Sequence, residues 1–424
     1  MNWRFWSTAV GAILLAAVTA AAAYYFVGSR SSFDPDRINR YYAALKVPPS
    51  APVSTEQVRA AVARSADYLR RANLGSGQFV YIVNMNPAVT VPPQYNLLRH
   101  AGTIYSIGMA NSVVPDNENV EVMRRAVAFM RGCCMTDLEL NDVIGIWEPN
   151  EIVHERSPPS FKLGGAGLAL VALTSLAKFD SSSVRTEELE GLARFGQFMQ
   201  RWDGQFFATY VPSEGGRQLP GASLYYPGEM ALGWLMLYEQ HPNREWIDSA
   251  VEALEYLARE RAASGEAPAD HWALLATARL FQIADREGLS IPRDLLLSHA
   301  LQVCHTILEE GRTTSILPAM DGALVPHGVI TPTATRLEGL LATRTFLAVD
   351  HPITAHVDAA IHRGMDFLAR AQVKDGPHAG AFPYAITTIP DDNIGSMAAF
   401  NARATEVRID YVQHALSAMV QYLQ

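Results

Sequence analysis

The sequence predicts an all-α fold: an (α/α)6 toroid of six helical hairpins with small β-hairpins in its loops, preceded by one N-terminal transmembrane helix. Helical patterns alternate with Gly- and Pro-rich gaps, and each pair of helices spans about 55–65 residues. One helix of each pair carries charges of both signs, whereas the other is apolar on nearly every side. A single uncharged segment precedes the first pair, which completes the prediction.

The helical patterns occur at twelve places and therefore form six pairs. Repeated helix pairs form either an open solenoid or a closed ring, and long loops ahead of the apolar helices favour the ring. This makes 54–424 one toroid domain. The helices are expected at 54–72, 96–111, 119–131, 161–179, 186–201, 222–240, 243–263, 268–287, 293–310, 332–349, 352–371 and 404–423.

Several loops contain short alternating stretches that are rich in Gly, Pro and aromatic residues. Such stretches predict small β-hairpins, which would wall a funnel at the N-terminal ends of the inner helices. They lie at 78–83, 205–211, 315–329 and 380–389.

Residues 7–27 carry no charge and would reach about 30 Å as a helix, enough to cross a bilayer. Arg4 precedes this segment, and aromatic residues stand at both of its ends, as in membrane anchors. The sequence therefore favours an uncleaved inner-membrane anchor at 1–28, a linker at 29–53 and a periplasmic domain. The alternative is a cleaved signal peptide, which would leave a periplasmic or secreted domain.

Composition excludes several classes of protein. With 49% hydrophobic and 18% charged residues the chain can bury a core, and its net charge of −9 argues against nucleic-acid binding. The cysteines Cys133, Cys134 and Cys304 cannot form a disulfide framework, and adjacent cysteines rarely bond each other. Segment 163–167 is Gly-rich, but close helix packing explains it better than a phosphate loop, so no cofactor is expected.

Five of the six expected inner helices begin with charged or aromatic residues and then become apolar. Buried charges need partners, and several that converge on one funnel indicate a polar ligand. The candidate catalytic acids are Glu229, Asp270 and Asp410. The candidate binding residues are Arg99, His100, Tyr225, Tyr226, His271, Trp272, Arg336, Glu338, Arg408 and His414.

Several of these residues also have a purely structural explanation. Asp270 is suited to capping the N-terminus of its helix by accepting backbone N–H bonds. Arg408 and Asp410 are close enough in sequence to form a structural ion pair. The functional interpretation is favoured because the clusters fall at equivalent points of the repeat.

Segments 224–239, 270–276 and 408–414 resemble the six-hairpin superfamily of carbohydrate-active proteins, which includes glycoside hydrolases, polysaccharide lyases and sugar epimerases. Tyr226-Pro227-Gly228-Glu229, followed by Trp234, is similar to the Pro-Gly-His…Glu-Trp segment of N-acylglucosamine 2-epimerases. The histidine of that family is absent, so its role as a base is not carried over. The resemblance covers 54–424 and implies a protein that acts on sugars.

A second toroid family, the lanthionine-cyclase-like proteins, binds zinc through a distant Cys and a Cys-His pair. Cys304-His305 matches the pair, but the Gly-rich repeats of that family are missing and Cys304 lies in an outer-type helix. The sequence therefore predicts no metal site.

The favoured function is a cell-envelope enzyme that hydrolyses an anionic or acetylated polysaccharide or oligosaccharide. Hydrolysis needs one protonated and one ionised carboxyl group beside the scissile bond. Glu229 and Asp270 are the first choice for this pair and Asp410 is the next, because the helices that carry them could face each other across the funnel.

Two other classes of function remain. A uronate lyase or epimerase would use His100, His271 or Tyr226 as the base and Arg99 or Arg408 to neutralise the substrate carboxylate. A non-catalytic protein would bind or assemble polysaccharide at the membrane, as a partner of an export machinery. The predicted anchor favours this third class.

Overall fold

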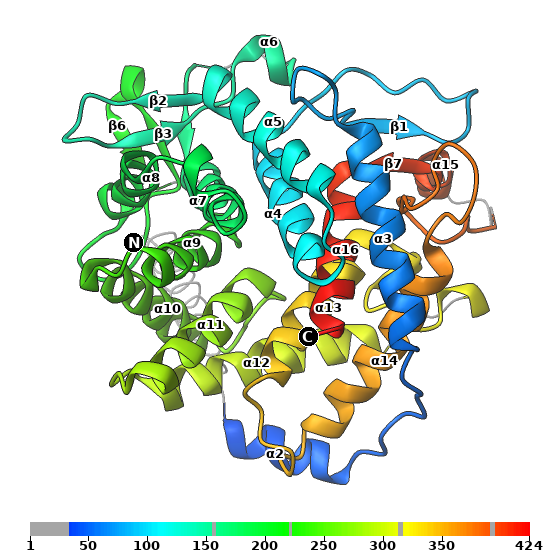
Figure 1. The fold of residues 1–424 in the computed structure, drawn as a ribbon. Helices are drawn as coiled ribbons and strands as arrows, with labels where there is room; N and C mark the ends of the chain where they lie inside the picture. The colour runs from blue at the N-terminus through cyan, green and yellow to red at the C-terminus, as the bar shows by residue number, and fades with distance from the viewer. Residues whose placement is uncertain (1–33, 155–157, 220–222, 313–316, 391–394) are drawn as a thin grey trace, which may run out of the picture.

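The computed structural model describes residues 34–424 except 155–157, 220–222, 313–316 and 391–394 (Figure 1). Six inner helices alternate along the chain with six outer ones. The inner helices are α4 (Leu97–Val113), α7 (Leu163–Ala177), α9 (Tyr226–Gln240), α11 (His271–Glu287), α13 (Ile330–Arg344) and α16 (Ile409–Tyr422). The outer helices are α3 (Thr55–Ala72), α5 (Asn117–Cys133), α8 (Thr186–Met199), α10 (Arg244–Ser264), α12 (Arg293–Gly311) and α14 (Thr354–Ala371).

The inner helices form a closed ring. Each packs against the next in chain order, and α16 packs against both α13 and α4, which joins the last hairpin to the first. Figure 1 shows the red α16 beside the cyan α4. The contact between α16 and α4 rules out an open solenoid for the described residues, so the predicted toroid is confirmed.

The sequence difference between the two sets of helices explains their places. α7 is buried from Leu163 to Leu176 without interruption, as a helix apolar on all sides must be. α10 instead buries one face and leaves charged residues such as Arg259 exposed. The apolar surface of the outer helices therefore covers the inner ring.

Gly167 shows how closely the inner helices pack. A Cβ atom here would lie 2.8 Å from the backbone nitrogen of Met230 and 2.9 Å from the carbonyl carbon of Glu229. The Gly-rich start of α7 thus serves the close packing that the sequence predicted.

The Gly167→Ala variant is expected to lose about 1–3 kcal/mol of unfolding free energy, measured by urea denaturation, because the helices must move apart. Gly132 in α5 is the matched control, since among the described residues no atom outside its own stretch of helix lies within 4 Å of a Cβ atom there. The Gly132→Ala variant should keep its stability or gain about 0.5–1 kcal/mol, because Ala is the better helix former. Equal losses in the two variants would contradict the close packing of α7 against α9.

The described strands are short, lie in the loops and form three small sheets. β1 (Ile82–Asn84) pairs with β7 (Glu406–Arg408) in antiparallel register, with Ile82 opposite Arg408. β4 (Phe161–Lys162), β5 (Thr209–Val211) and β6 (Gly216–Gln218) form a three-stranded sheet, and β2 (Met135–Asp137) pairs with β3 (Ile144–Ile146). The predicted hairpin at 78–83 is therefore one strand of a pair that joins the first and last loops.

Two other predicted hairpins are different structures. The described part of 315–329 holds the 3-10 helices η3 (Pro318–Met320) and η4 (Pro326–Gly328), and 380–389 contributes isolated bridges to distant residues. The sequence also gave no indication of α2 (Pro35–Ala44), α6 (Asn150–Val153) and α15 (Gly395–Arg403), or of η1 (Ser181–Ser183) and η2 (Pro212–Glu214). α2 lies inside the predicted linker and packs on α12, where the Tyr42 hydroxyl is 3.0 Å from His305 Nδ1.

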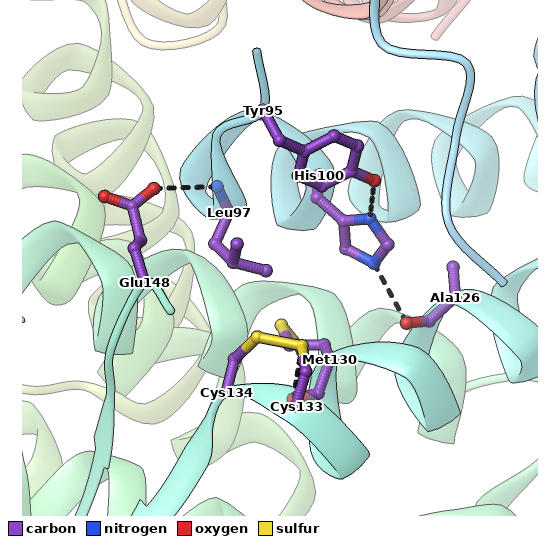
Figure 2. Close-up of a disulfide and its surroundings, with 8 residues drawn as sticks. All are labelled: Tyr95, Leu97, His100, Ala126, Met130, Cys133, Cys134 and Glu148. Carbon is purple, nitrogen blue, oxygen red and sulfur yellow. Dashed lines mark hydrogen bonds between the residues drawn. A yellow bond between two sulfur atoms is a disulfide. The ribbon is translucent and has the colours of Figure 1, made fainter. Parts of the chain in front are cut away.

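Cys133 and Cys134 form a disulfide at the end of α5, contrary to the expectation from sequence (Figure 2). The helix ends at Cys133, and Cys134 is its C-cap with φ −139° and ψ −16°. Cys304 is a free, buried cysteine.

Among the residues that the structure describes, no helix is long and apolar enough to cross a membrane. This finding contradicts the predicted location at the inner membrane, and that prediction is withdrawn. The segment 7–27, on which it depended, lies outside the described residues.

Candidate functional site

A cavity of about 500 Å³ opens at the N-terminal ends of the inner helices, where the sequence predicted a funnel. This volume is within the range of small-molecule binding sites. Polar and aromatic side chains from the starts of α4, α9, α11 and α16 supply much of the wall. They include Asn96, Arg99, Tyr225, Tyr226, Glu229, His271, Trp272, Arg408, Asp410, Tyr411, Gln413 and His414.

Asp410 holds two arginines on one side of this cavity. Its two oxygens accept bonds of 2.5 and 2.9 Å from Arg408, and Arg99 Nε lies 3.2 Å from Oδ2. Burial raises the pKa of Asp410, but the bonds and charges of Arg408 and then Arg99 outweigh burial, so the pKa is lowered. Arg99 also donates to the Tyr81 hydroxyl at 2.6 Å, which ties the group to the strand pairing of β1. The cluster of two arginines and one carboxylate carries a net positive charge.

Glu338, His271 and His414 meet in a second cluster, from the neighbouring helices α13, α11 and α16. His414 Nδ1 lies 2.8 Å from Glu338 Oε2, and His271 Nε2 lies 3.8 Å from the same oxygen. The two imidazole ring centres are 5.4 Å apart. Glu338 is buried, and this burial raises its pKa against the lowering effect of His414.

His271 is a buried imidazole without a hydrogen bond. Among the described residues neither of its ring nitrogens has a hydrogen-bond partner, although only 1% of the residue is exposed. Burial lowers its pKa well below the usual value, and the charges of His414 and Arg336 act in the same direction. The ring is therefore neutral and offers a free lone pair beside the cavity, which it lines.

Glu229 lines the cavity with a buried carboxyl group. It is 4% exposed, and its Oε2 has no hydrogen-bond partner among the described residues. Burial raises its pKa well above the usual value, and the charge of Asp270 adds to this effect. Such a group can donate a proton.

Asp270, the other carboxylate of the favoured pair, does not line the cavity. It caps α11 by accepting a 3.1 Å bond from the Ala273 backbone nitrogen, and Arg261 donates to its Oδ2 at 2.6 Å. Both side chains are at most 4% exposed, and Arg261 also contacts His299. The structural explanation that the sequence offered for Asp270 is the one the geometry supports. Its neighbour His271 faces the cavity instead.

Besides Glu338, whose contacts are given above, two further predicted residues do not line the cavity. His100 is fully buried between α4 and α5, where its ring nitrogens contact the Tyr95 hydroxyl at 2.8 Å and the Ala126 carbonyl at 2.9 Å (Figure 2). Arg336 donates to Glu310 and to the Pro332 carbonyl, and it does not pair with Glu338.

His100 is expected to make the fold sensitive to acid. Burial lowers its pKa from 6.5 to about 4, so the unfolded state takes up the proton first as the pH falls. The neutral ring makes its full contribution to the free energy of unfolding above pH 6.5, the pKa of the unfolded state. This contribution is lost as the pH falls towards 4, the pKa of the folded state. Between about pH 8 and about pH 5 we expect this group to lower the free energy of unfolding, measured with urea, by about 2 kcal/mol. The His100→Gln variant should show a correspondingly smaller loss, and an equal loss would contradict this assignment.

No protein-family model and no curated protein matches the sequence. Among solved structures the chain is similar to a D-mannose isomerase, with TM-score 0.63 and 11% identity over 88% of this chain and 99% of that one. A sugar epimerase from a ruminal bacterium gives TM-score 0.60 and 12% identity over 87% and 98% of the two chains. An unsaturated glucuronyl hydrolase specific for heparin gives 0.57 and 11% over 87% and 97%.

The chain has the (α/α)6 fold of the six-hairpin carbohydrate-active enzymes. The resemblance predicted from sequence is therefore confirmed for the fold. Identities of 11–12% show the fold alone, so the reaction must be argued from the side chains of this toroid.

Several residues that line the toroid cavity were missed as candidates. Tyr411 packs its ring 4.7 Å from the Arg408 guanidinium, and Ser223 and Thr331 lie in the loops. Tyr411 directly follows Asp410, so its place at the start of the last inner helix was a usable signal. Ser223 and Thr331 offered none, because single hydroxyl residues in loops are common.

Proposed function

We propose that this toroid is a sugar isomerase or epimerase that moves a proton between carbons of a reducing sugar. The observation that carries the proposal is the pair of imidazoles of His271 and His414, which line the cavity with their ring centres 5.4 Å apart. Both rings contact the same carboxylate oxygen of Glu338. Histidine is the side chain most often used for general acid–base catalysis.

In the proposed reaction one imidazole removes the proton from carbon 2 of the open-chain aldose, which gives an enediolate. Delivery of a proton to carbon 1, with the hydroxyl proton of O2 moving to O1, gives the ketose. Delivery of a proton to carbon 2 from the opposite face by the other imidazole gives the epimer. His414 Nδ1 is engaged by Glu338, so Nε2 is the ring nitrogen left for the sugar. Glu338 would orient this ring and stabilise its charged form, as carboxylates do beside catalytic histidines.

The remaining wall suits a sugar. Tyr225, Tyr226 and Trp272 present aromatic surface to the cavity, and Arg99 and Arg408 place positive charge where an enediolate oxygen would develop negative charge. A sugar isomerase and a sugar epimerase are among the solved structures of similar fold, which supports the proposal without deciding the substrate.

The proposal is tested with the purified full chain and a panel of neutral, N-acetylated and uronic-acid monosaccharides and short oligosaccharides in D2O. We expect proton NMR to show conversion of at least one sugar with solvent deuterium at carbon 1 or 2. No conversion and no exchange across the panel would overturn it.

Glycan hydrolysis is the second candidate, and it is favoured by Glu229 and Asp410. Both line the cavity, but the pKa of Glu229 is raised and that of Asp410 is lowered, which is the contrast expected of a proton donor and an ionised partner. The pair first chosen from sequence, Glu229 with Asp270, receives less support because Asp270 is bound by Arg261.

The Glu229→Gln variant separates the two candidates. If the protein is a hydrolase, the unaltered chain should release reducing ends from anionic or acetylated glycans. The rate of this release should fall about 10²–10⁴-fold in the variant, because glutamine cannot donate the proton. If the protein is an isomerase, the unaltered chain should release no reducing ends from these glycans. Glutamine closely matches the glutamate side chain in size and shape, so stability measured by urea unfolding should change little.

A further inference from the structure

The cluster of His271, Glu338 and His414 has a second chemical property. Each residue offers one ligand atom, two imidazole nitrogens and one carboxylate oxygen, and these atoms all lie within 4.8 Å of one another. They come from three consecutive helices of the inner ring, so the ring itself fixes their spacing.

Two imidazoles and one carboxylate form a ligand set of catalytic zinc sites, which leave the fourth position open to water or substrate. Tetrahedral ligands at about 2.0–2.1 Å from zinc lie about 3.3 Å from each other. The contacts of Glu338 Oε2, 2.8 Å to His414 Nδ1 and 3.8 Å to His271 Nε2, bracket this spacing. Small rotations of the three side chains would therefore converge them on one ion.

The surroundings also favour an added ligand. Both ring nitrogens of His271 are buried and lack a hydrogen-bond partner among the described residues. A buried polar atom without a hydrogen-bond partner destabilises the fold, so a group that binds there gains from satisfying it. The cluster lies at the cavity wall, which His271 and His414 both line.

We propose that His271, Glu338 and His414 form a binding site for a divalent transition-metal ion of the zinc type, with its open coordination position facing the cavity. Binding displaces the proton shared by Glu338 and His414 Nδ1 and occupies a lone pair of each histidine. The ion would therefore inhibit proton transfer by these histidines, and this consequence rests on the proposed function.

The binding test uses the full chain after dialysis against EDTA, titrated with Zn²⁺ by calorimetry and counted by elemental analysis after desalting. We expect one zinc ion per chain and, with Co²⁺, the visible absorption of a tetrahedral site. Replacing residues outside the ligand set already weakens metal sites about 10–100-fold, so His271→Asn and Glu338→Gln should weaken this one by at least about 100-fold. Circular dichroism establishes that each variant is folded.

His305→Asn is the matched control, because Cys304-His305 is the pair that the sequence offered for zinc. Its zinc affinity should equal that of the unaltered chain. Zinc that is lost in His305→Asn and kept in Glu338→Gln would overturn the proposal, as would a chain that takes up no zinc.

Inhibition is measured separately. Saturating zinc should abolish deuterium exchange into the sugar, and EDTA should restore it. Exchange that continues with zinc bound would overturn the inhibitory role. A metal-free chain without exchange would count against the proposed function, while the zinc count still decides whether the site exists.

Discussion

The His414→Asn variant is expected to lower kcat for the proposed isomerisation by about 10²–10⁴-fold, the usual contribution of a general acid or base. Asparagine retains a polar side chain but has no group that gains and loses a proton near neutral pH. Deuterium exchange followed by NMR measures the effect for the same sugar in both chains.

Glu338→Gln provides the complementary measurement. Its carboxyl group lies 2.8 Å from His414 Nδ1, so we assign it a positioning role. The glutamine amide can hold the ring in the wrong tautomer, which predicts a lower kcat with a changed pH profile and little change in KM. His100→Gln is the control, because His100 lies outside the cavity and should leave kcat unchanged. A His414→Asn chain that keeps more than about a tenth of the rate would contradict a role as catalytic base.

The largest expected effect on stability is that of Arg261→Met. Arg261 and Asp270 form an ion pair in which both side chains are at most 4% exposed, and loss of the arginine leaves a buried carboxylate without its cation. We expect a loss of about 3–5 kcal/mol in unfolding free energy by urea denaturation.

Arg259→Met is the control on the same helix, since Arg259 is exposed and pairs with Glu255 one turn away. Its loss should stay below about 0.5–1 kcal/mol. The double variant of Arg261→Met and Asp270→Asn should lose less unfolding free energy than the two single variants lose in sum, because asparagine removes the unpaired charge. Equal losses in Arg261→Met and Arg259→Met would contradict this account of the pair.

Asp270→Asn also tests the choice between structure and catalysis. Asparagine keeps an acceptor for the Ala273 nitrogen, so the cap of α11 remains. We expect a stability loss and a largely retained kcat. A chain of normal stability that has lost all activity would instead favour the hydrolytic pair of Glu229 with Asp270.

The sequence by itself determined the fold of the described domain. The alternation of mixed-charge and apolar helices identified all twelve helices of the ring, because a helix that is apolar on every side must be buried on every side. The clustering of polar residues at the starts of the apolar helices also indicated the N-terminal end of the ring, where a cavity lined by many of these residues opens. α2 was missed because its short pattern, at 35–44, depends on docking against α12 through Tyr42.

Only the tertiary structure decided which polar residues face the cavity. Successive residues of a helix point about 100° apart, so Asp270 and His271 have different surroundings although they are adjacent in sequence. Asp270 is hydrogen-bonded to Arg261, whereas His271 Nε2 lies 3.8 Å from the carboxylate of Glu338, which is far from His271 along the chain. The periodicity of a helix in the sequence does not reveal how that helix is rotated against its neighbours. That rotation brings His271, Glu338 and His414 together.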